Sequence, residues 1–321
     1  MHQGAPVRAR QSYRHEAFLW DQSRQFTDEM ASFVEDGLAR DEPVMAVLLP
    51  EHIEWLRAAL GPQAGQVTFL DMGEVGGNPA RLIPALQAWL DEHDGHSRPT
   101  RGIGEPICPG RRSEEIGECQ LHEALLNVAF DPETPFWLIC PYEANELPEA
   151  VVAQAHQSHH ALFDTSGYRG STAYEGGALV SALFNAELPP PSGADGEQAA
   201  EHVEVRFSPQ NVQDVFAVVM KEAYTAELWS DRAIDLARAT RELASSALHR
   251  GGEKVVLRLW TLPDALVCEV SDRTVITDVL AGRRLPREHD KDALWSANQT
   301  CDLVQLRSGT WGTTVRLFAY R

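Results

Sequence analysis

The stretch that decides the fold of the C-terminal part is DRAIDLARATRELASSALHRGGEKVVLRLWTLPDALVCEVSDRTVI, residues 231–276. Residues 231–250 carry apolar side chains at helical spacing, which predicts an amphipathic helix that ends at Gly251-Gly252. The run KVVLRLW that follows alternates apolar and polar side chains and predicts a strand. A turn at Pro263-Asp264 leads into a second strand, ALVCEVSD. We therefore expect a helix followed by a β-hairpin.

Several short motifs occur in order around this stretch. They are Glu242, His249-Arg250-Gly251, Cys268-Glu269-Val270-Ser271-Asp272, Leu294-Trp295, Asn298-Gln299, Cys301-Asp302 and a final strand from Gly312-Thr313-Thr314. In this order they resemble the ATP-binding domain of the anti-sigma kinases, the RsbW-like branch of the GHKL ATPases, whose relatives include the histidine kinases. The resemblance covers residues 203–321. It implies a two-layer α/β sandwich of the GHKL ATPase (Bergerat, or HATPase) type.

The same resemblance assigns roles to individual residues of a nucleotide site. It implies that Glu242 is the general base that activates a protein hydroxyl. It also implies that Asp272 recognises the adenine amino group and that His249 lies near the phosphates. An alternative is that Glu242 and His249 are exposed remnants on a helix face.

Several positions of that nucleotide site depart from the family pattern. The magnesium-binding Asn is Ser246, the turn glycines are Thr274 and Ile276, and the lid glycine is Ala293. A hydroxyl is a poorer magnesium ligand than an amide carbonyl, and side chains in place of glycine obstruct close approach of the backbone to a nucleotide. We therefore expect a pseudokinase that needs no cofactor. ATP and magnesium would bind only if the degenerate site still works.

The N-terminal half alternates short apolar runs with longer amphipathic segments. Strands are expected at 43–50, 67–72, 101–110 (with a loop) and 135–142, and helices at 23–42, 51–61, 78–93, 113–130 and 146–162. Short apolar strands separated by helices predict a mostly parallel sheet covered on both faces. Residues 166–202, rich in proline, glycine and acid near their end, predict a linker.

This half also carries motifs in a recognisable order. They are His15-Glu16-Ala17-Phe18-Leu19-Trp20, Gly104-Glu105-Pro106, Glu115 through His122-Glu123-Ala124-Leu125-Leu126-Asn127, Cys140-Pro141-Tyr142 and Ser158-His159. Together they resemble the MEDS (DcmR-like) sensory domain, which is related to the RecA/KaiC core, and imply such a domain over residues 15–165. RecA-like relatives hold phosphate with a glycine-rich loop after the first strand. The segment expected there, Leu48–His52, lacks those glycines and the Lys-Ser/Thr pair, so we expect no ATP hydrolysis in this half.

The MEDS resemblance also favours certain pocket residues without naming a ligand. They are Glu105, Arg111 or Arg112, Glu115, His122, Glu123 and Tyr142. Independently of the resemblance, helical spacing places Glu115, Glu118, Cys119 and His122 on one face of the helix 113–130.

This polar helix face has three interpretations. With Glu105 and His159 it could line a small-molecule pocket or bind a transition metal; the simplest interpretation is a Glu–His pair at helical spacing. Our candidate ligand-binding set is Glu105, Arg111, Glu115, Glu118, His122, Tyr142 and His159, and we expect no metal.

Other histidines and cysteines support weaker hypotheses. His156, His159 and His160 suggest zinc, but cations that complement the end of a helix explain them sufficiently. A nucleophilic Cys108 or Cys140 paired with a histidine is not expected, because nothing near either residue in the sequence supplies the loop such a site needs.

Composition limits the classes of function. Among 321 residues the formal net charge is −19, and residues from 203 onward hold 16 Lys+Arg and 16 Asp+Glu, so the whole excess of acid precedes them. An acidic surface repels nucleic acid and anionic membranes, so we expect no direct contact with either. The sequence has neither a signal peptide nor an apolar run long enough to cross a bilayer, and its five scattered cysteines form no framework. We expect a cytoplasmic protein.

These features favour a bacterial regulator of transcription. The resemblances imply an RsbA-like or RsbW-like anti-sigma regulatory protein that receives a small-molecule signal through its N-terminal half. Its C-terminal half would bind a sigma factor or an anti-sigma antagonist. One alternative is an active ATP-dependent serine/histidine protein kinase. The other is a small-molecule sensor whose C-terminal half serves for homodimerisation.

Overall fold

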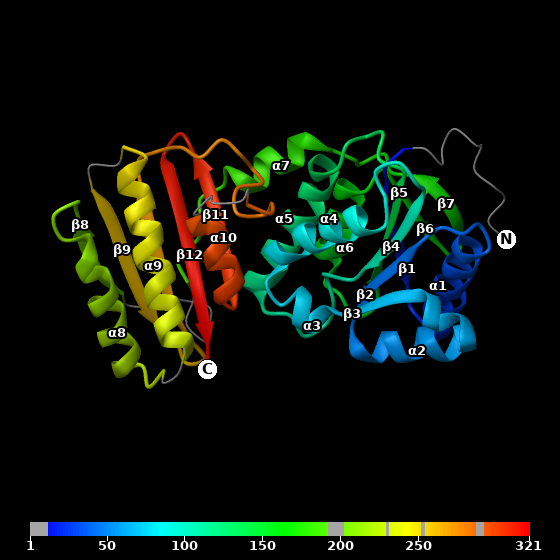
Figure 1. Ribbon diagram of the computed structural model, residues 1–321, viewed down its shortest axis with the longest axis horizontal. Helices are drawn as coiled ribbons and strands as arrows, with labels where there is room; N and C mark the ends of the chain where they lie inside the picture. The colour runs from blue at the N-terminus through cyan, green and yellow to red at the C-terminus, as the bar shows by residue number, and fades with distance from the viewer. Residues whose placement is uncertain (1–11, 192–201, 229–230, 252–253, 287–291) are drawn as a thin grey trace. The chain divides into compact units, whose positions relative to one another are not determined.

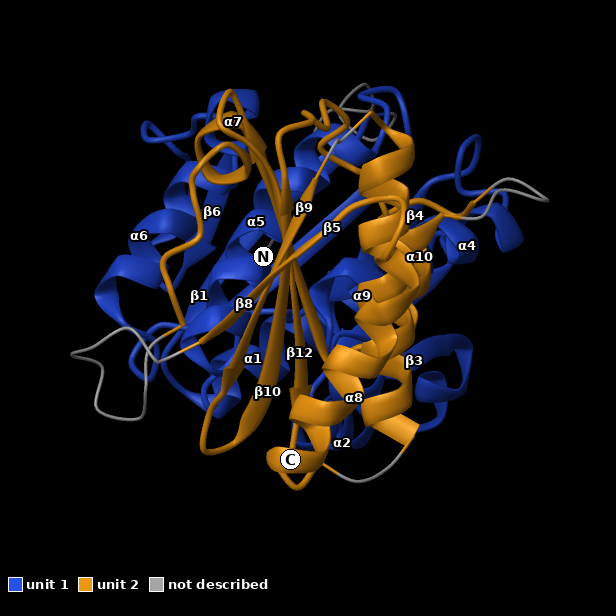
Figure 2. Ribbon diagram, turned by 90° about the vertical axis from the view of Figure 1, so that its left-hand side faces the viewer, with its two compact units in different colours: residues 1–180 blue, residues 181–321 orange. Residues whose placement is uncertain are grey.

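The computed structural model describes residues 12–191, 202–228, 231–251, 254–286 and 292–321. The chain divides into two compact units, residues 1–180 and residues 181–321 (Figure 2). The segment predicted as a linker, 166–202, includes residues 192–201, which lie outside the described residues. Its earlier part holds the strand β7 (Gly167–Gly170) and the helix α7 (Gly177–Phe184).

The first unit is built on a seven-stranded sheet in the order β3-β2-β4-β5-β1-β6-β7 (Figure 1). The remaining strands are β1 (Arg14–Trp20), β2 (Val44–Leu48), β3 (Val67–Asp71), β4 (Thr100–Gly104), β5 (Phe136–Glu143) and β6 (Ala161–Asp164). Every neighbouring pair is parallel except β6 and β7, which pair antiparallel. The predicted mostly parallel sheet is therefore confirmed.

Helices cover both faces of this sheet. They are α1 (Ser23–Leu38), α2 (Pro50–Leu60), η2 (Gly61–Gln66), α3 (Met72–Val75), η3 (Pro79–Arg81), α4 (Leu82–Glu92), α5 (Ser113–Ala129) and α6 (Glu149–Ser158). An apolar core joins α1 and α2 to the sheet through residues such as Phe18, Phe26, Met30, Leu56 and Ile139. Because side chains alternate along a strand, His15 of β1 points to the opposite face from Phe18, toward α5.

Two local predictions in this unit were wrong. The first strand is β1, not residues 43–50, so the loop after the first strand is Asp21-Gln22 rather than Leu48–His52. The charged residues of β1 hide its strand character, and Glu16 is satisfied inside the sheet by Arg14 and Trp137. The helix predicted over 146–162 ends at Ser158, because the following residues pair with β1 as β6.

The second unit is an antiparallel sheet in the order β11-β12-β10-β9-β8. Its strands are β8 (Val203–Phe207), β9 (Val255–Thr261), β10 (Ala265–Asp272), β11 (Leu303–Gly309) and β12 (Gly312–Tyr320), and its helices η4 (Val212–Asp214), α8 (Val215–Thr225), α9 (Asp231–His249) and α10 (Ala293–Thr300). The helices α8, α9 and α10 lie along one face of the sheet (Figure 2). The predicted helix and β-hairpin within 231–276 are thus confirmed as α9, β9 and β10.

The other face of this sheet carries a buried ion cluster. Glu269 of β10 accepts hydrogen bonds from Arg316 of β12 at 2.7 and 3.0 Å and from Arg258 of β9 at 3.0 Å. Glu204 of β8 binds the same Arg258 at 3.1 Å. The cluster lines a cavity of about 210 Å³ together with Trp260. It ties four neighbouring strands together through side chains as well as backbone.

None of the helices in the described parts of the chain combines the length and apolar character that a bilayer crossing requires.

Candidate functional sites

The first candidate site is a cluster of four buried side chains within the first unit. His15 comes from β1, Cys140 from β5 and Glu123 from α5, while His159 directly follows α6. Each is at most 1% exposed. Residues so far apart in the sequence meet because β1 and β5 are adjacent in the sheet and α5 packs against α6.

Glu123 lies at the centre of this His–Glu–Cys cluster. Its Oε2 lies 3.0 Å from Nε2 of His15 and 3.1 Å from Nε2 of His159. The thiol Sγ of Cys140 lies 3.4 Å from Nε2 of His15. All four side chains therefore direct one nitrogen, oxygen or sulfur atom at a common point.

Burial sets the ionisation of the cluster. It lowers the pKa of His15 to about 4, an effect that the charge of His159 reinforces and Glu123 opposes. Burial also disfavours the charged form of Glu123, and the pKa of this carboxyl is held below its usual range only by the protonated forms of His15 and His159. Burial and the nearby Glu123 raise the pKa of the Cys140 thiol. At neutral pH, His15 is therefore uncharged and Cys140 a thiol.

Part of the predicted ligand-binding set lies at this cluster. His159 is a member, and the ring of Tyr142 meets that of His159 edge to face at 5.7 Å. Glu123, favoured by the MEDS resemblance, is the central carboxylate. Glu105, in contrast, accepts a hydrogen bond from His52 at 2.8 Å.

The remaining predicted ligand residues have other surroundings. Arg111 donates to the carbonyl of Gly76 at 2.9 Å, and Glu115 accepts from the backbone N–H of Arg112 at the start of α5. Glu118 and His122 are buried on the same helix. Their shared helix face was predicted correctly by spacing, but the carboxylate that meets His159 is Glu123.

Sequence reasoning missed His15 and Cys140 as members of a site. Both were visible as residues of the resemblance, yet nothing local links them, because they are brought together only by the pairing of β1 with β5. Asn127 was also missed, and its Oδ1 lies 3.3 Å from Nδ1 of His15. A histidine inside a central, largely buried strand is the signal that could have found the site.

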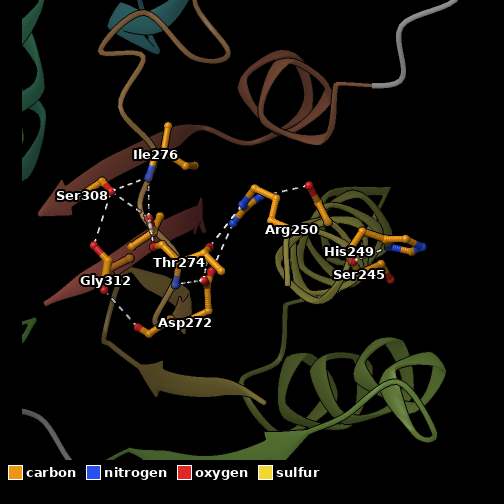
Figure 3. Close-up of polar contacts among 12 residues, drawn as sticks. Ser245, His249, Arg250, Asp272, Thr274, Ile276, Ser308 and Gly312 are labelled. Carbon is orange, nitrogen blue, oxygen red and sulfur yellow. Dashed lines mark hydrogen bonds and ion pairs between the residues drawn. The ribbon is translucent and has the colours of Figure 1, made fainter. Parts of the chain in front are cut away.

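The second candidate site is the altered nucleotide site of the second unit (Figure 3). The Asp272 carboxylate accepts hydrogen bonds from Arg250 at 3.1 Å and from the backbone N–H of Thr274 at 2.6 Å, and it also binds the Thr274 hydroxyl. Thr313 donates to the carbonyl of Thr274 at 2.7 Å. Both oxygens of the side chain expected to recognise adenine are thus bound within the protein.

The other residues that the resemblance assigns to the nucleotide site differ in whether they lie near this carboxylate. The hydroxyl of Ser246 accepts from Arg250 at 3.0 Å, and Glu242 is exposed on α9. His249 is exposed and points away from Asp272, with its Nδ1 2.7 Å from the carbonyl of Ser245 (Figure 3). Ala293 is the first residue of α10. Arg250, which sequence reasoning gave no role, is the side chain that reaches the site.

Comparison with known families concerns the first unit. Residues 14–160 match the family model described as MEDS, the MEthanogen/methylotroph, DcmR Sensory domain. This part of the chain is a MEDS domain. No curated protein matches the chain. The prediction of a MEDS-like domain is therefore confirmed, and the resemblance of residues 203–321 to the anti-sigma kinases stays a prediction.

Proposed function

We propose that the chain is a regulatory signalling protein in which the MEDS domain senses a small molecule and the second unit passes the signal to a protein partner. The observation that carries this proposal is the match of residues 14–160 to a sensory domain. The buried polar cluster within that domain supports it, because ionisable groups gathered in an apolar interior are typical of functional sites.

The second unit, in this proposal, is a protein-binding domain of the anti-sigma type with the GHKL fold. The motif order in the sequence and the antiparallel sheet with helices on one face support this assignment. The parallel sheet of the first unit similarly supports a RecA/KaiC-like core. The partner would be a sigma factor or an anti-sigma antagonist, which would place the protein in the cytoplasm.

The surroundings of Asp272 support the proposed loss of ATP use. A carboxylate that recognises an adenine amino group must be reachable by it, whereas the Asp272 side chain is 2% exposed and both its oxygens already accept hydrogen bonds from Arg250 and Thr274. Displacing them would leave polar groups unpaired, at about 1–3 kcal/mol for each group. Phosphoryl transfer also depends on metal placement, and the hydroxyl of Ser246 is bonded to Arg250.

Two measurements on the full chain test the proposal. Calorimetric titration with ATP and magnesium is expected to show no micromolar binding, and Arg250→Ala, which frees one oxygen of Asp272, is not expected to restore it. Binding is then measured against the sigma factors and anti-sigma antagonists encoded in the same genome, and at least one is expected to bind without nucleotide.

The alternatives predict different results. Micromolar ATP affinity, with phosphate transfer to an antagonist that disappears in Glu242→Ala, would support an active kinase instead. A chain that binds none of these proteins but forms a stable dimer would support a sensor that uses its second unit for homodimerisation.

A further inference from the structure

The His–Glu–Cys cluster of the first unit has the composition and geometry of a metal centre. His15, Glu123, Cys140 and His159 each offer one ligand atom, and these atoms all lie within 4.8 Å of one another. We propose that these four side chains bind a single Zn²⁺ ion. This inference goes beyond the proposed signalling function and does not depend on it.

The distances within the cluster suit a tetrahedral ion. Zinc binds nitrogen and oxygen at about 2.0–2.1 Å and sulfur at about 2.3 Å, so tetrahedral ligand atoms are separated by roughly 3.3–3.6 Å. The contacts here are 3.0 and 3.1 Å from Glu123 to the two histidines and 3.4 Å from Cys140 to His15. Shifts of a few tenths of an ångström would bring these three contacts to the required separations. The remaining pairs of ligand atoms, all within 4.8 Å, would close by at most roughly 1.5 Å when the ion binds.

The orientation of both imidazoles is set by groups outside the cluster. The Nδ2 amide of Asn127 donates to the carbonyl of Ser158 at 2.8 Å, so its Oδ1 faces Nδ1 of His15. Nδ1 of His159 lies 2.9 Å from the carbonyl of Ala155. Carbonyl oxygens only accept hydrogen bonds, so both Nδ1 atoms carry the proton. Each Nε2 then directs a lone pair into the cluster, the arrangement typical of metal-binding histidines.

These lone pairs create an electrostatic conflict that a cation resolves. Both Nε2 atoms face Oε2 of Glu123, so three electron-rich atoms point at one another. Within the described part of the chain, Oε1 of Glu123 and Nε2 of His159 are also buried without a hydrogen-bond partner. Buried polar atoms are almost always paired, so each such atom in a native protein calls for an explanation. A metal ion bound to both side chains supplies it.

The ligand types identify the class of metal. Two imidazoles, one thiolate and one carboxylate suit a borderline-soft ion such as Zn²⁺, whereas Mg²⁺ and Ca²⁺ require oxygen ligands. As the zinc–sulfur bond forms, the Cys140 thiol proton passes to solvent. The thiolate and Glu123 then neutralise the dication, which fits a site at most 1% exposed. Four protein ligands leave no open position, as in structural rather than catalytic zinc sites.

Metal analysis of the full chain tests the proposal. The wild type and the variants Cys140→Ala, Glu123→Gln and Cys119→Ala are purified from zinc-containing medium, and their zinc is measured by plasma mass spectrometry. Cys119 is a matched control, because it is an equally buried thiol that donates to the carbonyl of Pro106 instead. One zinc per chain is expected in the wild type and in Cys119→Ala. Roughly a tenfold or greater loss is expected in the other two variants.

Cobalt substitution gives a second readout that does not depend on the folding of a variant. Co²⁺ in the wild type is expected to show a thiolate-to-metal charge-transfer band and the intense visible bands of a four-coordinate site, both retained in Cys119→Ala. A wild type that contains no zinc, and takes up neither ion on refolding, overturns the proposal. Equal zinc in all four proteins, or cobalt spectra without the thiolate band, places the metal elsewhere and overturns it as well.

Discussion

Gly312 allows two strands of the second unit to approach each other more closely than any side chain would permit. It begins β12 with φ +125°, and a Cβ added there would lie 2.2 Å from the carbonyl oxygen of Asp272. This close approach lets the neighbouring Thr313 donate to the carbonyl of Thr274. In this way the segment around Thr274 and Ile276, where the resembling family has its turn glycines, is held to the sheet. We predict that Gly312→Ala destabilises the unit strongly.

The magnitude of this effect has two parts. Positive φ at a non-glycine residue costs about 1–3 kcal/mol. The overlap with the carbonyl oxygen of Asp272 and with Cα of Arg273 cannot be relieved by a side-chain movement, because both atoms belong to the backbone. Overpacking of this kind adds roughly 1–3 kcal/mol. Gly312→Ala should therefore cost about 2–6 kcal/mol in the free energy of unfolding.

Gly251 provides a matched control in the same unit. Its φ is +102°, and an added Cβ would meet no atom of the described chain within 4 Å. Gly251→Ala should therefore cost only the backbone strain, about 1–3 kcal/mol. The difference between the two variants isolates the steric overlap at Gly312.

Hydrogen-exchange mass spectrometry of the full chain measures both variants, because it reports each unit separately. Peptides from β10 and β12 should lose protection in Gly312→Ala by more than in Gly251→Ala, while peptides from residues 14–160 should not change. Equal losses in the two variants would show that the strands separate at no cost, and the account of the close approach would then be refuted.

Two further predictions concern buried charges. Burial lowers the pKa of His52, but the contact with Glu105 outweighs burial and raises this pKa above its usual value. The charged His52 therefore stabilises the folded protein fully below pH ~6.5, and this stabilisation falls as the pH rises through the raised pKa. The difference in melting temperature between wild type and His52→Gln should therefore shrink between about pH 6.5 and pH 9, and a constant difference would contradict this. Glu269→Gln leaves the buried Arg316 without its counter-charge and should cost about 3–5 kcal/mol in urea unfolding. Glu204→Gln, in the more exposed pair with Arg258, should cost clearly less because solvent screens that pair, and equal costs would refute the role of burial.

The local structure of this protein could be read largely from its sequence. Helical spacing predicted α9 and α5, and alternation predicted β9. The turn at Pro263-Asp264 predicted the second strand, β10, and the run of apolar strands and helices predicted a mostly parallel sheet. These patterns are local, because a helix or strand repeats its buried side every 3.6 or 2 residues, about the span of one element. The order of short motifs likewise identified the MEDS domain before any contact was known.

The same reasoning missed two strands whose sequences do not show the alternation or apolar run of a strand. The strand β1 carries Arg14, His15 and Glu16 in succession, so it resembles a polar segment, although it lies in the middle of the sheet. The ion pair between Arg14 and Glu16 makes these charges compatible with burial. The strand β6 was missed for a different reason, because its apolar residues continue the helical pattern of α6.

The candidate sites were decided by tertiary structure alone. His15 and Glu123 are separated by more than a hundred residues, and their contact depends on the strand order and on the packing of α5 against the sheet. Arg250 likewise reaches Asp272 only because α9 lies across β10. Helical spacing relates residues within one element and carries no information about which face of another element they meet. That information comes from the way the apolar faces of all the elements pack together.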